Sequence, residues 1–135
     1  MALAQVGGGY QLGDGNVNEI RLGYSAAPQT ATSTATLTVA QITGNVLVAN
    51  PSTSAATYTL PTAAAIDAVL GNAKVGSTFE LAIVNTGTSS GTVTLSMGTG
   101  LTDGGNAAVA IAITSSALFR FRKTGDAAYT VYKIA

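Results

Sequence analysis

The 135-residue sequence contains no cysteine, no histidine and no tryptophan, and only 9% of its residues are charged. Without cysteine the chain has no disulfide framework and no thiolate metal site. Without histidine, the commonest general base near neutral pH is missing, so nothing obvious activates the many serine and threonine hydroxyls. We therefore expect no enzyme, no cofactor and no bound metal.

The few carboxylates favour the same interpretation. Most of them lie in or beside Gly-rich turns or on a predicted helix, where Asp is favoured for local hydrogen bonding. Asp103 in LTDGGN, or Asp14 together with Asn16, could contribute oxygen ligands to calcium. One carboxylate per loop is too few for a tight site, so we expect turn chemistry at these positions.

The charge balance indicates a protein subunit. The formal net charge at pH 7 is zero, which leaves little electrostatic repulsion to oppose association. Nucleic acids and anionic membranes require clustered cations, and the nearest approach is Arg120, Arg122 and Lys123, which we interpret as a solvated strand face. No run approaches the roughly 18 apolar residues of a membrane span, and the N-terminus lacks a secretory signal pattern. We expect neither nucleic acid nor membrane as a partner.

Two regions are expected along the chain. Residues 1–17 are rich in glycine and show no periodicity, so they are predicted to form an extended N-terminal arm. Residues 18–135 are predicted to form one β-sandwich domain, without a tandem repeat. A Pro, Thr and Ala linker is expected from Ser25 to Ser33.

Alternation of apolar and polar residues predicts about eight strands, spaced by roughly 8 to 15 residues. The second half is the more regular, and two of its strands are expected to pair as a hairpin across the Asn85–Gly91 loop. The expected strands are Asn18–Tyr24, Thr36–Val39, Val46–Val48, Thr57–Leu60, Thr78–Ile83, Val93–Met97, Val109–Ile113, Phe119–Arg122 and Tyr129–Ile134.

A single helix is predicted from Pro61 to Gly71, because Pro and Thr open a run of good helix formers and Gly closes it. A helix this short needs a sheet to pack on, and Ile66, Val69 and Leu70 share one face. The strands and this helix together predict an all-β, jelly-roll-like β-sandwich.

Four segments resemble small structural proteins of tailed-bacteriophage heads, and most of all the head decoration, or cement, proteins. They are TYTLPTAAAIDAVLG, GSTFELAIVNTG, TVTLSMGTGLTDGG and ITSSALFRFRKTGDAAYTVYKIA, which together span Thr57 to Ala135. Residues 1–56 match less clearly. Other virion proteins, including head fibres and tail-fibre domains, use similar Thr- and Gly-rich β-segments.

The resemblance implies a protein made in the host cytoplasm that binds the major capsid protein on the outer surface of the virion, often as a homotrimer. It implies stabilisation of the shell rather than catalysis. The arm and the first predicted strand are the expected contact to the capsid or to a neighbouring subunit. The interface residues expected there are Leu3, Val6, Tyr10, Leu12, Ile20, Leu22 and Tyr24.

A glycan-binding or receptor-binding module of a head fibre or tail fibre is the alternative. Sugar recognition generally uses exposed aromatic platforms, and this chain offers five tyrosines but no tryptophan. Tyr129 and Tyr132 lie three apart on one predicted strand and therefore face opposite sides, so one of them could be exposed.

Overall fold

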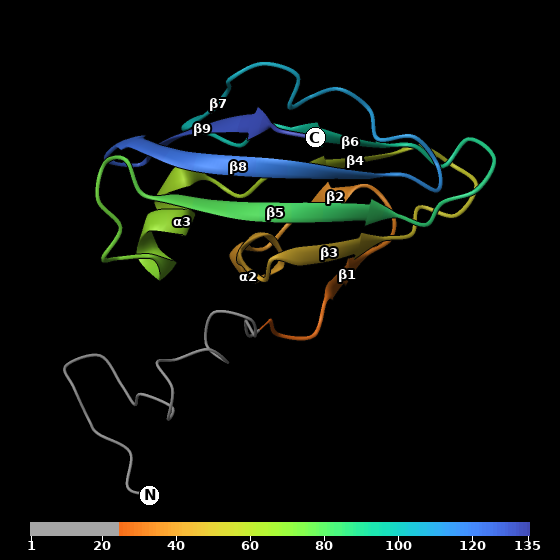
Figure 1. Ribbon diagram of the computed structural model, residues 1–135, viewed down its shortest axis with the longest axis horizontal. Coiled ribbons are helices and arrows are strands. Elements are labelled where there is room, and N and C mark those ends of the chain that lie inside the picture. The colour runs from red at the N-terminus through yellow and green to blue at the C-terminus, as the bar shows by residue number, and fades with distance from the viewer. Residues whose placement is uncertain (1–24) are drawn as a thin grey trace, which may run out of the picture.

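The computed structural model describes residues 25–135, which form nine strands and two short helices (Figure 1). Strands prevail over helices, so the all-β prediction is confirmed. The elements in chain order are β1 (Gln29–Ala31), β2 (Ala35–Thr36), α2 (Val39–Thr43), β3 (Val46–Ala49), β4 (Ala56–Thr59), α3 (Ala63–Val69), β5 (Thr78–Asn85), β6 (Val93–Ser96), β7 (Leu101–Asp103), β8 (Ser116–Gly125) and β9 (Ala128–Lys133).

The first six strands alternate between two sheets. β1, β3 and β5 pair in parallel in a six-stranded sheet of order β1-β3-β5-β8-β9-β7, and β2, β4 and β6 pair in parallel in a three-stranded sheet. The chain therefore winds as a coil, and each of three turns adds one strand to each sheet. In Figure 1 the three-stranded sheet lies behind the six-stranded one. The helices α2 and α3 lie in the returns from the smaller sheet to the larger.

The antiparallel hairpin β8–β9 completes the larger sheet beside β5, and β7 adds in parallel at its edge. Five of the seven strand pairings are parallel. A jelly roll is built from antiparallel strands, so the jelly-roll part of the prediction is not confirmed. The predicted hairpin between β5 and β6 is wrong, because β6 leaves the larger sheet and pairs with β4.

Successive turns of the chain repeat one another in structure, although no tandem repeat was expected from the sequence. The segments VANPSTSAATYTL and VNTGTSSGTVTLSM stack strand on strand, with Ala49 beside Asn85 and Ala56 beside Val93. The first turn is shorter, since Gln29 lies beside Leu47. The turns are therefore alike in their strand stacking but unequal in length.

Helix α2 replaces the end of a predicted strand, Thr36–Val39. The backbone N–H of Gln41 donates to the Thr38 hydroxyl and the Gln41 side chain accepts from the Thr38 N–H, which forms a complete capping box. Ile42 is fully buried beneath the sheet. The Thr-x-x-Gln signal stands in the sequence, but the Thr-rich alternation before it favoured a strand.

Two loops were also misjudged. The expected linker up to Ser33 contains β1, and the expected Gly98–Asn106 loop contains β7. The predicted strand Val109–Ile113 is wrong, since only an isolated bridge between Val93 and Ile111 forms there and Val109 is 51% exposed. The Asp103 carboxylate accepts three backbone N–H groups that follow it and so holds this segment as a loop.

Helix α3 confirms the predicted helix, with the Thr62 hydroxyl accepting the Ala65 N–H at its N-terminus. Ile66 packs into the core, whereas Val69, expected on the same face, is 63% exposed. Strands β3, β4, β5, β6, β8 and β9 confirm the predicted strands in their regions.

The core lies between the sheets and is built from inward positions of both. Its largest fully buried side chains include Tyr58, Phe119, Phe121 and Tyr129. Phe79 stacks on Phe121 with ring centroids 4.6 Å apart. Much of the remaining core is Ala, Val, Leu and Ile, so the packing depends on close approach of the sheets.

Asn85 joins the two sheets where the chain leaves β5. Its side chain is buried at 1% exposure and donates to the carbonyls of Gly91, Ile111 and Ala112. Its amide oxygen accepts the Gly87 N–H at 2.8 Å. One side chain thus satisfies backbone groups of the crossing loop and of the loop before β8.

The substitution Asn85→Ala is expected to destabilise the protein by roughly 3 kcal/mol, because several buried backbone groups lose their partner at about 1–3 kcal/mol each. Urea denaturation measures the change. Asn72→Ala, at an exposed position, is the control and is expected to change stability by less than about 0.5 kcal/mol. Equal effects of the two substitutions would contradict a structural role for Asn85.

Asp67 ties helix α3 to the β8–β9 hairpin. Its carboxylate accepts from Lys123 Nζ at 2.6 Å, from the Tyr129 hydroxyl at 2.8 Å and from the Ala127 N–H at 2.8 Å. Lys123 is only 6% exposed and its Nζ lies 5.6 Å from the centroid of the Tyr129 ring. The three elements therefore meet at one carboxylate.

These contacts shift two pKa values in opposite directions. The hydrogen bond from Lys123, followed by those from Ala127 and Tyr129, lowers the pKa of Asp67 to about 2. Burial, with the Asp67 carboxylate as a second cause, raises the pKa of Tyr129 to about 12. The carboxylate stays ionised and the phenol stays a donor across the physiological range.

Acid is expected to weaken this contact between about pH 4 and pH 2. The pKa of Asp67 is lower in the folded state than its ordinary value of 3.8, so the unfolded chain binds a proton first and stability falls as the pH drops through this window. Asp67→Asn should lower the melting temperature at pH 7, because Lys123 then lacks its counter-ion. It should also flatten the pH dependence of unfolding relative to wild type, and an unchanged pH dependence would contradict this assignment.

Candidate interaction surface

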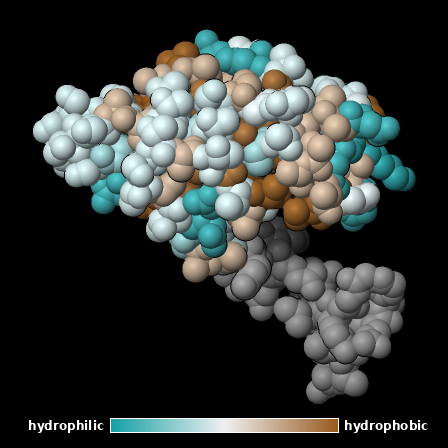
Figure 2. Space-filling model, turned by 180° about the vertical axis from the view of Figure 1, so that it is seen from behind, coloured by the Kyte–Doolittle hydropathy of each residue, from teal (hydrophilic) through white to brown (hydrophobic). Residues whose placement is uncertain are grey.

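The outer face of the three-stranded sheet carries a ladder of hydroxyls. Thr36, Thr59 and Ser96 lie side by side on successive strands, and so do Thr57 and Thr94. Figure 2, seen from behind, shows pale and tan surface with separate brown patches on this side. The paired positions of this ladder thus present hydroxyls to solvent.

The outer face of the six-stranded sheet is different, because its outward side chains separate by kind. Inward positions of the same strands, such as Leu47, Leu81 and Phe119, belong to the core. The outward side chains near one end, which we call the apolar half, are Val46, Val48, Ala82, Val84, Leu118 and Ile134. The exposed Ser116 interrupts the apolar half beside Val84. The outward side chains near the other end, the polar half, are Thr78, Glu80, Arg120, Arg122, Thr130 and Tyr132.

The apolar half is contiguous across three strands and the C-terminal residues. Ala82 lies between Val46 on one side and Leu118 on the other, and the Ile134 N–H donates to the Leu118 carbonyl at 2.7 Å. Val84 is 37% exposed and Ile134 is 50% exposed. None of the described elements covers this face, since α2 and α3 bury their apolar residues in the core on the other side.

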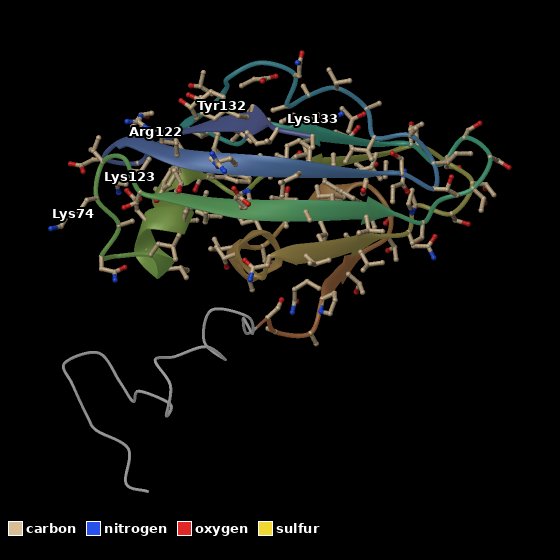
Figure 3. All side chains as sticks on the ribbon, in the orientation of Figure 1. Lys74, Arg122, Lys123, Tyr132 and Lys133 are labelled. Atoms are coloured by element: carbon tan, nitrogen blue, oxygen red, sulfur yellow. The ribbon has the colours of Figure 1, made fainter. Side chains whose placement is uncertain are left out.

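The polar half carries one acidic and two basic side chains. Arg120 Nε donates to Glu80 Oε1 at 3.0 Å, and both side chains are nearly half exposed. Arg122 has no ion-pair partner among residues 25–135. Tyr132 lies on the neighbouring strand (Figure 3) and packs against Gly104, where a Cβ would come within 2.5 Å of the ring. This half forms a weakly cationic margin to the apolar half.

Both edges of the six-stranded sheet are blunted against strand addition. β1 has three residues and follows Pro28, and its Thr30 carbonyl already accepts Gln41 Nε2 at 2.8 Å. The opposite edge is β7, which also has three residues. Short edges with a proline and side-chain caps disfavour pairing with another chain. A partner is therefore more favourably bound by the face than by the edges.

A small pocket lies beside the end of α3, with a volume of about 290 Å³. Leu70, Asn72, Ser77, Phe79 and Tyr129 contribute to its lining. Thr78 lines it too, and two of its three hydroxyl side chains are engaged, since Ser77 Oγ accepts the Lys74 N–H and the Tyr129 hydroxyl donates to Asp67. It falls just below the usual range of about 300–1,000 Å³ for ligand sites.

Within the part of the chain that the structure describes, no three residues of the metal-ligating types gather at one place. No helix between residues 25 and 135 is long and apolar enough to cross a membrane.

The interface residues expected from the sequence are not placed by the structure. Leu3, Val6, Tyr10, Leu12, Ile20, Leu22 and Tyr24 all lie outside the described residues, as do the arm of residues 1–17 and the first predicted strand.

One expectation within the described range is wrong. The prediction that Lys123 shares a solvated face with Arg120 and Arg122 is wrong, because its side chain points inward to Asp67 at the α3 end of the sheet (Figure 3). Strand alternation alone predicts an inward Lys123 side chain, because Lys123 shares the parity of the buried Phe119 and Phe121.

The tyrosines are placed as predicted where they are described. Tyr129 is buried and Tyr132 is partly exposed on the opposite side of the strand. The apolar half was missed altogether, because its members come from separate strands whose pairing the sequence did not reveal.

Comparisons with protein-family models, with curated proteins and with solved structures found no match to this chain.

The Glu80–Arg120 pair is expected to contribute little to folding. A double-mutant cycle with Glu80→Ala and Arg120→Ala should give a coupling energy of about 0.2–1 kcal/mol that fades in 1 M NaCl, as for other exposed pairs. Urea denaturation of the four proteins measures it. A salt-independent coupling of several kcal/mol would assign the pair to the structural framework instead of the surface.

Proposed function

We propose that this chain is a non-enzymatic virion structural protein, a capsid decoration or cement protein that binds the outer surface of a tailed-phage head. Its partner is the major capsid protein, and it acts as a homotrimer on the virion. The observation that supports this proposal best is the uncovered apolar half of the outer sheet face. The resemblance of the segments between Thr57 and Ala135 to head decoration proteins supports it independently.

The outer face has the anatomy of a protein-binding surface. Removing its apolar half from water lowers the free energy of the complex, so this half can form the centre of an interface. Its polar half can form a rim that stays partly hydrated. Only three charged side chains occur among the outward positions named above, so docking desolvates few charges. The binding free energy of one subunit is therefore expected to be modest.

Repetition on a symmetric shell makes a modest contact sufficient. Each bound copy adds its own binding free energy to the assembled state, and linked copies bind with an effective concentration far above that of free ones. Stabilisation of a shell needs no catalytic group, which agrees with the lack of histidine and cysteine. The proposal thus assigns the protein a mechanical role.

The alternative, a glycan-binding or receptor-binding module of a head or tail fibre, has less support. Tyr58 and Tyr129 are buried, and Tyr132 covers Gly104 instead of forming a free platform. The pocket beside α3 offers a partly buried Phe79, but two of its three hydroxyl side chains already have partners.

Leu118→Asp is expected to weaken binding to phage heads at least tenfold, because it places a charge at the centre of the apolar half. The measurement is co-sedimentation of the purified protein with heads assembled without it. Thr57→Asp, on the hydroxyl face, is the matched control and should bind as wild type. Circular dichroism checks that both variants fold.

Electron cryo-microscopy of the same heads is expected to show wild-type copies in groups of three, and decorated heads should survive heating better than bare ones. Equal binding of the two Asp variants would reject the outer face as the docking surface. Absence of wild-type binding to any head, together with selective binding on a glycan array, would favour the alternative function.

A further inference from the structure

The boundary between β5 and β8, which we call the seam, is the centre of the six-stranded sheet. These strands are the third and fourth in the order β1-β3-β5-β8-β9-β7, and they run side by side in Figure 1. A twofold axis that follows the seam above the outer face places β5 of one copy over β8 of another. The same axis places β3 over β9 and β1 over β7, so two sheets overlap along their whole width.

The outward residues that pair across the seam are complementary about this axis. Ala82 pairs with Leu118, and Glu80 pairs with Arg120. A second copy turned about the axis therefore sets apolar Ala82 over apolar Leu118. It also sets the Glu80 carboxylate over the Arg120 guanidinium. One surface thus matches itself, as an isologous interface requires.

The remaining cation of the face, Arg122, does not oppose this contact. Its partner across the seam is Thr78, so a hydroxyl of the second copy lies over the guanidinium. The two copies of Arg122 are offset sideways by one strand spacing of about 4.8 Å and separated by the roughly 10 Å between packed sheets. Their Cα atoms are therefore about 11 Å apart, slightly more than one Debye length at 0.1 M ionic strength. Salt screens most of their repulsion.

The exposed ion pair has groups left for a second copy. Arg120 donates through Nε and Nη2 to the same oxygen, Glu80 Oε1. Among residues 25–135, neither Glu80 Oε2 nor Arg120 Nη1 makes a hydrogen bond. Two such pairs brought together at the seam form a ring of four alternating charges, in which each carboxylate has a guanidinium of both copies beside it.

Other positions of the axis are less favourable. An axis along β8 sets Arg120 over Arg120 and Arg122 over Arg122, and an axis along β5 sets Glu80 over Glu80. Like charges that face each other across an interface disfavour association. An axis perpendicular to the strands, between the two halves, sets the apolar half over the polar half and desolvates charges against apolar side chains. The seam avoids all three arrangements.

We propose that the isolated protein forms a twofold dimer through the outer face of its six-stranded sheet, with β5 of each copy over β8 of the other. The occupant of the apolar half is then a second copy of this chain. Sheets packed face to face keep their strand directions within about 30° of each other, which this axis allows at the seam. The formal net charge of zero leaves little long-range repulsion between copies.

The size of the face predicts a weak dimer. Four strands side by side span about 19 Å, and the eight residues of β5 span about 27 Å. This is roughly 500 Å² for each copy, whereas a standard interface buries about 800 Å² for each partner. We therefore expect a dissociation constant in the micromolar range or above. The dimer occupies the same face as the proposed capsid contact, but it concerns the isolated protein and holds or fails independently of that function.

Sedimentation equilibrium of the full chain between about 1 and 500 μM tests the dimer. The mass is expected to rise from the 13.4 kDa of one chain towards twice that value. Glu80→Arg makes both sides of the seam cationic at this row and Arg120→Glu makes both anionic, so each variant alone should dimerise at least tenfold more weakly. An equimolar mixture of the two variants should dimerise at least as tightly as wild type, because each carboxylate then faces a guanidinium.

Thr57→Asp, on the hydroxyl face, is the matched control and should dimerise as wild type. The double variant Glu80→Arg/Arg120→Glu exchanges the charges within one chain and should dimerise within about threefold of wild type. Circular dichroism verifies that every variant folds. A wild-type chain that stays monomeric up to about 500 μM, a trimer as the main species, or a dimer that both single variants retain overturns the proposal.

Discussion

Where a backbone crosses from one sheet to the other, its buried N–H and C=O groups still need hydrogen-bond partners. At the third crossing this constraint falls on Asn85, whose buried amide serves the crossing loop and the loop that leads into β8. With that crossing in place, β6 can stack on β4 while β5 stays beside β3. The parallel core of both sheets depends on this junction, and so does the position of β5 as the strand on which β8 pairs.

The two parts of the larger sheet are locked together at their other end by Asp67. The helix that carries it belongs to the wound part of the chain, whereas Lys123, Ala127 and Tyr129 belong to the hairpin. The parallel strands and the hairpin are therefore held in one sheet from both ends. A sheet fixed in this way presents its outward side chains in a constant arrangement, which the proposed docking would require.

Charge is used sparingly and with different effect on the two sides of the larger sheet. Inside, Lys123 and Asp67 form a partly buried pair that orients α3. Outside, Glu80 and Arg120 form an exposed pair beside uncharged neighbours. Few charges remain on the outer face. Its apolar half and its polar half each consist of side chains from several paired strands.

Local patterns in the sequence determined much of the secondary structure. Alternation identified the strands around Phe119 and Tyr129, the Thr62 cap identified α3, and the lack of histidine and cysteine removed most chemistry from consideration. The Thr38 capping box was readable too, but a competing alternation outweighed it. These features depend on neighbours a few residues apart.

Only the tertiary structure decided which strands pair and in which direction, because alternation has the same period of two in parallel and antiparallel sheets. Lys123 meets Asp67 across 56 residues of sequence, and no local pattern names that partner. The apolar half is likewise assembled from β3, β5, β8 and the C-terminal residues. Its members are unremarkable one by one along the chain, and they form a surface only because strand pairing brings them together.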